Sequence, residues 1–362
     1  MDAHKRYTLR LLSLILGMML ILLATSFYLQ PLTGDVTRIG GYAENDFGWN
    51  RPQPVFAQPA APMQAAYTQY ADVLAVGDSF SFGGLYGMLN FPWQGFLSAD
   101  TGLSVATISH YTNTNPPSYD PALLPAIVAG EAFQKTPPRV LILEVVERQL
   151  HMLPEFAGSC EAEHRLTPKP SFSLNPSVPQ LIEARRKQDR PSLKEQIAYA
   201  QKYLFAVLQR LWEKEPMVYA LELTTPALFS NKRSDRLLVY EADIKKKSWD
   251  EKQIASIRCK LINAQNLVQK NGKTLFLAMV VPDKLTAYAK RLKAPAYANT
   301  SVIERLASAK GLHLVRLDQA MQAAVEAGVV DVYLPNDTHW AFQGHKTAAA
   351  TLAQYLADFP GD

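Results

Sequence analysis

A serine that follows a short apolar run is the first residue of this chain able to do covalent chemistry. Residues 72–76 read Asp-Val-Leu-Ala-Val and stop at Gly77-Asp78-Ser79, which predicts a buried strand that leads into a turn. Gly77 permits tight backbone geometry, and backbone amides after the strand can face a developing oxyanion. Because Gly-Asp-Ser is a common tripeptide, a turn with an ordinary surface serine remains the alternative interpretation of this motif alone.

A carboxylate and an imidazole near the other end of the chain supply what a serine nucleophile requires. Asp337 and His339 lie in Asn-Asp-Thr-His-Trp, shortly before the final helix predicted at 347–357. A serine hydroxyl needs a base, and a carboxylate holds an imidazole base in the useful tautomer. A helix would separate the two side chains by about 200°, so this hypothesis requires a loop here. Alternatively, Asp337 caps the final helix and His339 is a polar loop residue.

Alternating strands and helices are expected to bring the two motifs together. Further apolar runs predict strands at 103–108, 139–146, 274–281 and 312–317, and helices are predicted at 121–134, 254–269, 301–309, 318–327 and 347–357. This alternation indicates an α/β fold with three layers, in which helices cover both faces of a central parallel sheet. Ligands of such sheets bind at the carboxyl ends of the strands, which is where Ser79 is expected.

In this order, serine first and Asp-x-His last, the motifs resemble those of the SGNH (GDSL-like) hydrolase superfamily. Five blocks extend the likeness to the alginate O-acetyltransferase (AlgJ/AlgX-like) family. They are residues 70–81, 93–97, 144–148, 282–288 (Pro-Asp-Lys with Tyr288) and 337–340 (Asp-Thr-His-Trp). The likeness covers residues 70–150 and 270–358.

The resemblance implies an enzyme that moves acetyl groups onto an exported polysaccharide. It implies Ser79 as nucleophile, His339 as base and Asp337 as the carboxylate that orients it. Acetyl-CoA is cytoplasmic, so it also implies a multi-pass membrane partner that passes the acetyl group outward. In the alginate enzymes the Asp-x-His-Trp block precedes Gly-Asp-Ser, whereas here it follows, so the particular glycan is not carried over.

The oxyanion hole departs from the SGNH pattern. The usual glycine and asparagine donors are missing from the expected positions. The backbone amide of Ser79 is the first candidate hydrogen-bond donor to the oxyanion. Asn113 and Asn115 are either further donors or plain turn residues.

Three more side chains are candidates for substrate contact. Arg148 ends a predicted buried strand, where it either binds a substrate carbonyl or carboxylate, or pairs with Glu144 or Glu147. Tyr288 and Trp340 either stack on sugar rings or pack in the core.

The N-terminal region predicts a membrane anchor. Residues 11–29 carry no charge and are long enough to cross a bilayer, and Lys5, Arg6 and Arg10 precede them. The positive-inside rule then predicts a cytoplasmic tail at 1–10 and an extracytoplasmic remainder, as on a bacterial inner membrane; a cleaved signal peptide is the competing interpretation. Residues 30–66 are predicted to be a spacer with little regular structure. The catalytic domain is expected at 67–362, with a partly helical insertion at 151–252.

The remaining composition excludes several classes of function. The net charge is +4, the basic residues are scattered, and the sequence contains no nucleic-acid-binding motif. We interpret the lysine run at 245–247 as a solvated surface. No cluster has metal-ligand spacing, and no cofactor is expected. Cys160 and Cys259 are either a disulfide or two isolated thiols.

Two rival functions remain open. The first is an acetyl-esterase that uses the same triad with water. The second is a noncatalytic glycan-binding subunit of an export complex.

Overall fold

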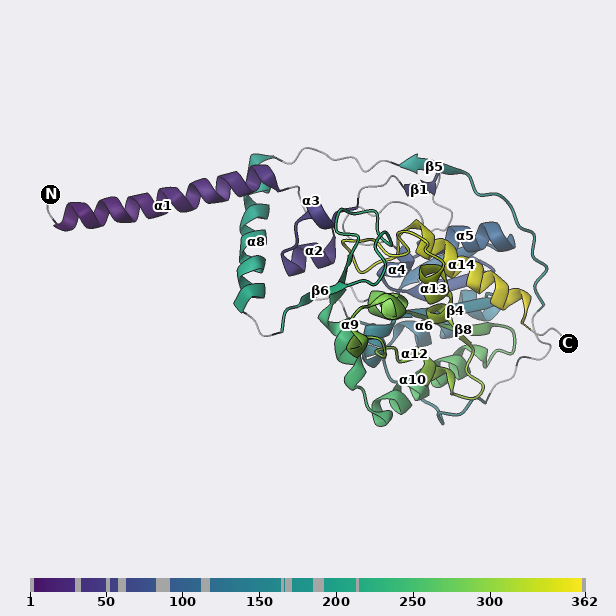
Figure 1. The fold of residues 1–362 in the computed structure, drawn as a ribbon. Coiled ribbons are helices and arrows are strands. Elements are labelled where there is room, and N and C mark those ends of the chain that lie inside the picture. Colours follow the sequence, from purple (N-terminus) through teal and green to yellow (C-terminus); the bar gives the residue numbers. More distant parts are fainter. Residues whose placement is uncertain are drawn as a thin grey trace.

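The computed structural model describes residues 3–29, 34–49, 53–57, 63–82, 92–111, 118–163, 166, 171–184, 192–212 and 215–359. A long N-terminal helix, α1 (Ala3–Tyr28), projects from a body built around one central sheet (Figure 1). α1 is apolar and long enough to cross a membrane, and the same properties suit a signal sequence.

The central sheet has five parallel strands in the order β3-β2-β4-β8-β9. These are β2 (Val73–Gly77), β3 (Val105–Ser109), β4 (Val140–Val146), β8 (Leu275–Val281) and β9 (Leu314–Val315). Every residue of β2, β4 and β8 is buried, as expected for a parallel sheet covered on both faces. The predicted α/β class is confirmed.

Helices cover both faces of this sheet. Successive strand residues point to opposite faces, so Ile142 of β4 lies in one apolar core and Leu141 in the other. Residues of α5 (Trp93–Thr101), α13 (Leu317–Glu326) and α14 (Phe342–Ala357) join the first core. Residues of α6 (Leu123–Ala129), α7 (Glu131–Lys135), α10 (Glu251–Gln269) and α12 (Ile303–Ala307) join the second. The helix predicted at 121–134 is interrupted by extended backbone at Gly130, which separates α6 from α7.

The prediction that residues 30–66 are a spacer with little regular structure is wrong for much of the segment. It contains α2 (Asp35–Gly40), α3 (Glu44–Phe47) and β1 (Gln53–Phe56). Val36 and Phe47 are buried against Val218 and Leu238. These apolar partners lie far away in the sequence, which is why the composition of the segment did not indicate folding.

The predicted insertion at 151–252 holds a second group of elements. β5 (Leu181–Ala184) pairs antiparallel with β1, and β6 (Val218–Glu222) pairs antiparallel with β7 (Arg236–Tyr240). The long helix of the insertion is α8 (Leu193–Trp212). Residues 231–250 include β7, α9 (Glu241–Lys245) and a 3-10 helix, η2 (Lys246–Ser248).

The short elements that complete the described chain flank the central sheet. They are α4 (Ser79–Phe82), α11 (Lys284–Tyr288) and the 3-10 helices η1 (Glu147–Met152), η3 (Ala289–Arg291) and η4 (Pro295–Tyr297).

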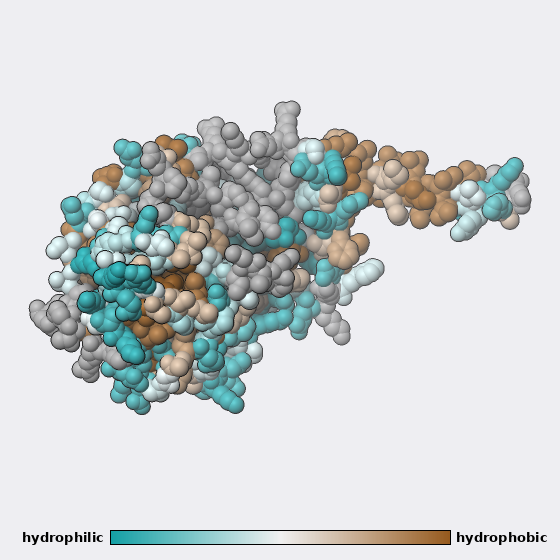
Figure 2. Space-filling model, turned by 180° about the vertical axis from the view of Figure 1, so that it is seen from behind, coloured by the Kyte–Doolittle hydropathy of each residue, from teal (hydrophilic) through white to brown (hydrophobic). Residues whose placement is uncertain are grey.

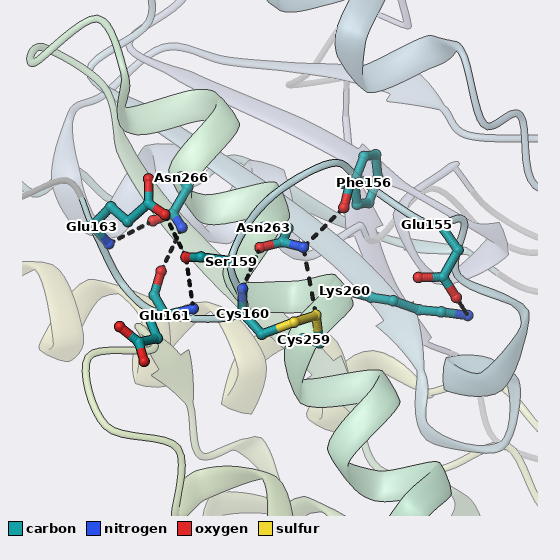
Figure 3. The surroundings of a disulfide bond; sticks show 10 residues. All are labelled: Glu155, Phe156, Ser159, Cys160, Glu161, Glu163, Cys259, Lys260, Asn263 and Asn266. Carbon is teal, nitrogen blue, oxygen red and sulfur yellow. Dashed lines mark hydrogen bonds and ion pairs between the residues drawn. A yellow bond between two sulfur atoms is a disulfide. The ribbon is translucent and has the colours of Figure 1, made fainter.

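Cys160 and Cys259 form a disulfide that ties the loop after η1 to α10 (Figure 3). Asn263, one turn further along α10, accepts a hydrogen bond from the backbone N–H of Cys160 at 3.1 Å. Its amide nitrogen donates to the carbonyl oxygen of Phe156 at 2.8 Å. The pairing that the sequence left open is therefore formed, across 99 residues of chain.

Candidate active site

Ser79 lies where β2 ends and α4 begins. A side chain at Gly77 would collide with Ser81 and Glu144, so only glycine fits this close approach. Asp78 fixes the turn, since its carboxylate accepts hydrogen bonds from the backbone N–H groups of Phe80 at 2.9 Å and Val146 at 3.3 Å. The serine is thereby held at the carboxyl end of the sheet, as predicted.

The structure brings Ser79, His339 and Asp337 into one hydrogen-bonded chain. The hydroxyl oxygen of Ser79 lies 2.6 Å from Nε2 of His339, and Nδ1 of His339 lies 2.6 Å from Oδ1 of Asp337. An ionised carboxylate only accepts, so Nδ1 carries the proton and Nε2 is left to accept from the serine. Asp337 and His339 lie in the loop between α13 and α14, which allows the close approach that a helix would forbid.

The electrostatics of the pair suit a base. Burial alone would raise the pKa of Asp337, but the charge of His339 and two hydrogen bonds from it outweigh burial and lower that pKa to about 2. Burial would lower the pKa of His339, whereas the charge and hydrogen bond of Asp337, together with the charge of Asp35, raise it. Asp337 is therefore ionised at neutral pH, and the imidazole binds a proton more readily than a free histidine does.

The backbone N–H of Ser79 is the one predicted oxyanion donor within the described residues. The hydrogen bonds of the described chain leave this amide unused, whereas the next two amides bond to Asp78. It is available to an oxygen bound beside the serine. Asn113 and Asn115 lie outside the described residues.

Asp35 is a residue that the sequence did not point to. Its carboxylate accepts hydrogen bonds from Thr338, at 2.8 Å from the backbone nitrogen and 2.5 Å from the hydroxyl. Its own backbone N–H donates to Oδ2 of Asp337 at 3.1 Å. Asp35 therefore holds both the loop and the carboxylate behind His339.

The segment around Asp35 interlocks with the Asp-x-His loop. Glu44 accepts hydrogen bonds from the side chains of Thr37 at 2.5 Å and Asn336 at 2.9 Å. Gly34 passes so close to the carbonyl of Asn336 that no side chain fits there. No local signal predicted this, because the donors and acceptors are about 300 residues apart.

Lys284 also holds the Asp-x-His loop in place. Its fully buried ammonium donates to the carbonyl oxygens of Leu334 at 2.7 Å, Pro335 at 3.0 Å and Asp337 at 3.1 Å. Burial lowers the pKa of this lysine to about 8, opposed by nearby carboxylates such as Asp35. The lysine of the Pro-Asp-Lys block therefore has a structural role, because it holds the loop that carries Asp337.

Arg148 does not pair with Glu144 or Glu147, the two partners proposed from the sequence. Its guanidinium lies 2.8 Å from the carboxylate of Asp283 and 3.5 Å from that of Asp243, and its side chain is 11% exposed. It also donates to the hydroxyl of Thr338 at 3.4 Å. The structure therefore places Arg148 behind the Asp-x-His loop, bound to protein carboxylates.

Lys246 completes this buried charge cluster. Its ammonium lies 2.7 Å from Glu147 and 2.5 Å from Asp283, and all three side chains are fully buried. The interpretation of 245–247 as a solvated run is wrong for Lys246, because the acidic residues Glu147 and Asp283, which follow β4 and β8, neutralise it inside the protein. Lys245 and Lys247 are exposed, as predicted for a solvated run.

Tyr288 and Trp340 belong to the core, so the sugar-stacking role proposed for them is wrong. Both are 0% exposed. Tyr288 stacks on Phe229 with ring centroids 4.8 Å apart, and Trp340 meets Phe80 edge to face at 5.0 Å. Phe80 also packs on the His339 ring at 4.7 Å, so Trp340 supports the imidazole through it.

The donor atoms of Asp35, Asp337 and His339 lie within 4.8 Å of one another, a spacing that a metal ion also accepts. Each of these side chains already makes hydrogen bonds within the protein: Asp35 to Thr338, Asp337 to His339, and His339 to Ser79. The arrangement is accounted for without an ion.

A large cavity lies away from the triad. It measures 1910 Å³ and is bordered by β9, α10, α14 and the disulfide, and none of the triad residues lines it. It therefore contributes nothing to the chemistry at Ser79.

The parallel sheet with two helical layers and the serine, histidine and aspartate at its carboxyl edge define an SGNH-type α/β domain. Residues 234–361 match the family described as "SGNH hydrolase-like domain, acetyltransferase AlgX". The family expected from the sequence motifs is confirmed. No curated protein and no solved structure matches the chain.

The match includes Asp337 and His339 but not Ser79. It begins inside the segment predicted as an insertion, so β7 and α9 belong to the family domain. The roles of the three residues stay predictions, and the geometry above is their support.

Proposed function

We propose that the chain is an O-acetyltransferase that forms an acetyl-serine at Ser79 and transfers the acetyl group to hydroxyls of an exported polysaccharide. The hydrogen-bonded chain from Ser79 through His339 to Asp337 carries the proposal. The family of residues 234–361, an SGNH hydrolase-like acetyltransferase domain, supports the reaction class.

The first half-reaction acylates the serine. Nε2 of His339 takes the hydroxyl proton as the serine oxygen attacks the carbonyl carbon of an acetyl donor. The backbone N–H of Ser79 donates to the oxyanion of the tetrahedral intermediate. When the intermediate collapses, the bond to the donor breaks and the imidazolium returns its proton to the leaving group.

The second half-reaction reverses these steps with a sugar hydroxyl. Nε2 of His339 takes the proton of the hydroxyl, whose oxygen attacks the acetyl-serine carbonyl. Collapse of the second intermediate frees the serine oxygen, which regains the proton from the imidazolium. Asp337 keeps the ring oriented and stabilises the imidazolium in both halves.

The apolar length of α1 supports a proposed location at the membrane. An uncleaved α1 holds the domain on the outer face of the inner membrane, beside a polysaccharide during export. A multi-pass membrane partner then supplies the acetyl group from the cytoplasmic side.

The test is intact-mass spectrometry of the full chain in detergent after exposure to an activated aryl acetate. An adduct of one acetyl group that maps to Ser79 and is absent from Ser79→Ala is the expected result. If Ser79→Ala acquires the same adduct and retains function in cells, a noncatalytic glycan-binding subunit is the better description.

An acetyl-esterase is the second candidate, because the triad is open to solvent: the His339 side chain is 13% exposed and Ser79 is half-buried. Water would then replace the sugar hydroxyl. Adding an unacetylated polysaccharide distinguishes the two activities. A transferase forms acetylated glycan at the expense of free acetate, whereas an esterase releases acetate at an unchanged rate.

A further inference from the structure

Helix α8 has one face packed against the protein. α8 contacts α1 and α2, and Ala206 is buried on the packed face, against Gly41 just after α2. The guanidinium of Arg210 donates to the carbonyl oxygens of Gly40 at 3.0 Å and Gly41 at 3.1 Å, and lies over the Tyr42 ring. These contacts fix the rotation of the helix about its own axis.

The other face of α8 presents large apolar side chains to the surroundings. At 100° per residue they fall within an arc of about 120° on the side opposite Ala206. They are Leu193 (52% exposed), Phe205 (70%), Leu208 (50%), Leu211 (69%) and Trp212 (85%). Lys194 and Gln201 share this arc near Leu193, whereas the other four apolar side chains gather in the last eight residues of α8. Exposed apolar side chains gathered in this way mark an interaction surface. We call these five residues the α8 stripe.

The position of α1 indicates what covers the stripe. α1 packs against α8 near its C-terminal end, where Ser26 is buried, and runs across it (Figure 1). α2 and the body of the protein lie on one side of α8, and α1 projects away on the other. The exposed apolar surface of α1 reaches the body at this junction (Figure 2).

We propose that the α8 stripe docks on the surface of the lipid bilayer that α1 crosses. A helix that lies across a spanning helix lies in the plane of the membrane, and the stripe faces the side where the apolar length of α1 places the lipid. A helix that is packed on the protein by one face and exposes apolar side chains on the other can insert them at the boundary between headgroups and acyl chains. Trp212, in the last turn, has the side chain preferred at that depth.

A pair of single-cysteine labels tests this docking in the full chain. Leu208→Cys reports on the stripe, and Lys202→Cys lies on the exposed polar side of the same helix. Each cysteine variant is labelled with an environment-sensitive fluorophore and reconstituted in nanodiscs of phosphatidylethanolamine and phosphatidylglycerol. The label at 208 is expected to shift to shorter wavelength and to lose most of its emission when the acyl chains are brominated. The label at 202 is expected to do neither.

Two results overturn the proposal. In one, both labels emit as in water and ignore bromination. In the other, the label at 208 becomes shielded only after other membrane proteins are added to the nanodiscs, which would make the stripe a protein-docking surface. Because both positions are exposed, the substitutions leave the fold and aryl acetate hydrolysis unchanged, and each variant is checked for both.

Discussion

Replacing Asp35 with alanine tests whether the segment after α1 positions the triad. The substitution removes two hydrogen bonds from Thr338, at 2.8 and 2.5 Å. A hydrogen bond to a charged group contributes about 1.5–3 kcal/mol, and part of it is recovered by water at this half-buried site. We expect a net loss of about 1.4–2.7 kcal/mol of transition-state stabilisation, which lowers kcat/KM about 10- to 100-fold.

The assay is hydrolysis of an activated aryl acetate by the full chain in detergent. A positioning role predicts that kcat falls while KM changes little, because Asp35 does not touch the substrate. The charge of Asp35 also raises the pKa of His339, so Asp35→Asn is expected to move the acidic limb of the pH–rate profile to lower pH. Asp46→Ala is the control, since this α3 carboxylate accepts no hydrogen bond within the described chain.

A double-mutant cycle with Thr338→Val sharpens the test. Because the two side chains share a hydrogen bond, their effects are expected to be non-additive, with a coupling energy of about 1 kcal/mol. The reasoning is refuted if Asp35→Ala keeps kcat/KM within about twofold of the parent, the range of an ordinary surface substitution. It is equally refuted if the two effects simply add.

Three further outcomes are expected. Lys246→Met leaves the buried carboxylate of Glu147 without its counter-charge and should lower the free energy of unfolding by about 3–5 kcal/mol in denaturant titrations, whereas Lys247→Met should change it by less than about 0.5 kcal/mol. Because the base must be unprotonated and the pKa of His339 is raised, aryl acetate hydrolysis should increase as the pH rises through a midpoint above 6.5; a midpoint below 6.5 contradicts the assignment. Replacing Cys160 and Cys259 with serine should cost about 2–5 kcal/mol of stability and leave kcat unchanged, since the disulfide lies away from Ser79.

The elements of the central sheet were predictable because their signals are local. The apolar runs that became β2, β4 and β8 are continuous, which is typical of strands buried on both faces. The triad residues were predictable for a related reason: each motif follows a strand or precedes a helix, and parallel strands place such loops at one edge.

The supporting residues were not predictable, because their meaning depends on distant partners. Asp35 sits in a stretch rich in proline, glycine and asparagine, and its partner Asp337 lies 302 residues away. Lys246 is the middle residue of a lysine run, and its burial depends on Glu147 and Asp283. The burial of Trp340 was not predictable either, because the sequence around a tryptophan beside a catalytic motif is the same whether the ring contacts a ligand or packs in the core.

The short distance in sequence between α1 and Asp35 has a practical consequence. Asp35 follows the last residue of α1 by seven positions, a length that spans at most about 25 Å even when fully extended. With α1 in the bilayer, as proposed, Ser79 would be held at a nearly constant height above the membrane and could not swing out to reach distant strands of the proposed glycan. Any water-soluble version of the enzyme that is trimmed a few residues too far would fold around its sheet yet lack the carboxylate that steadies its base.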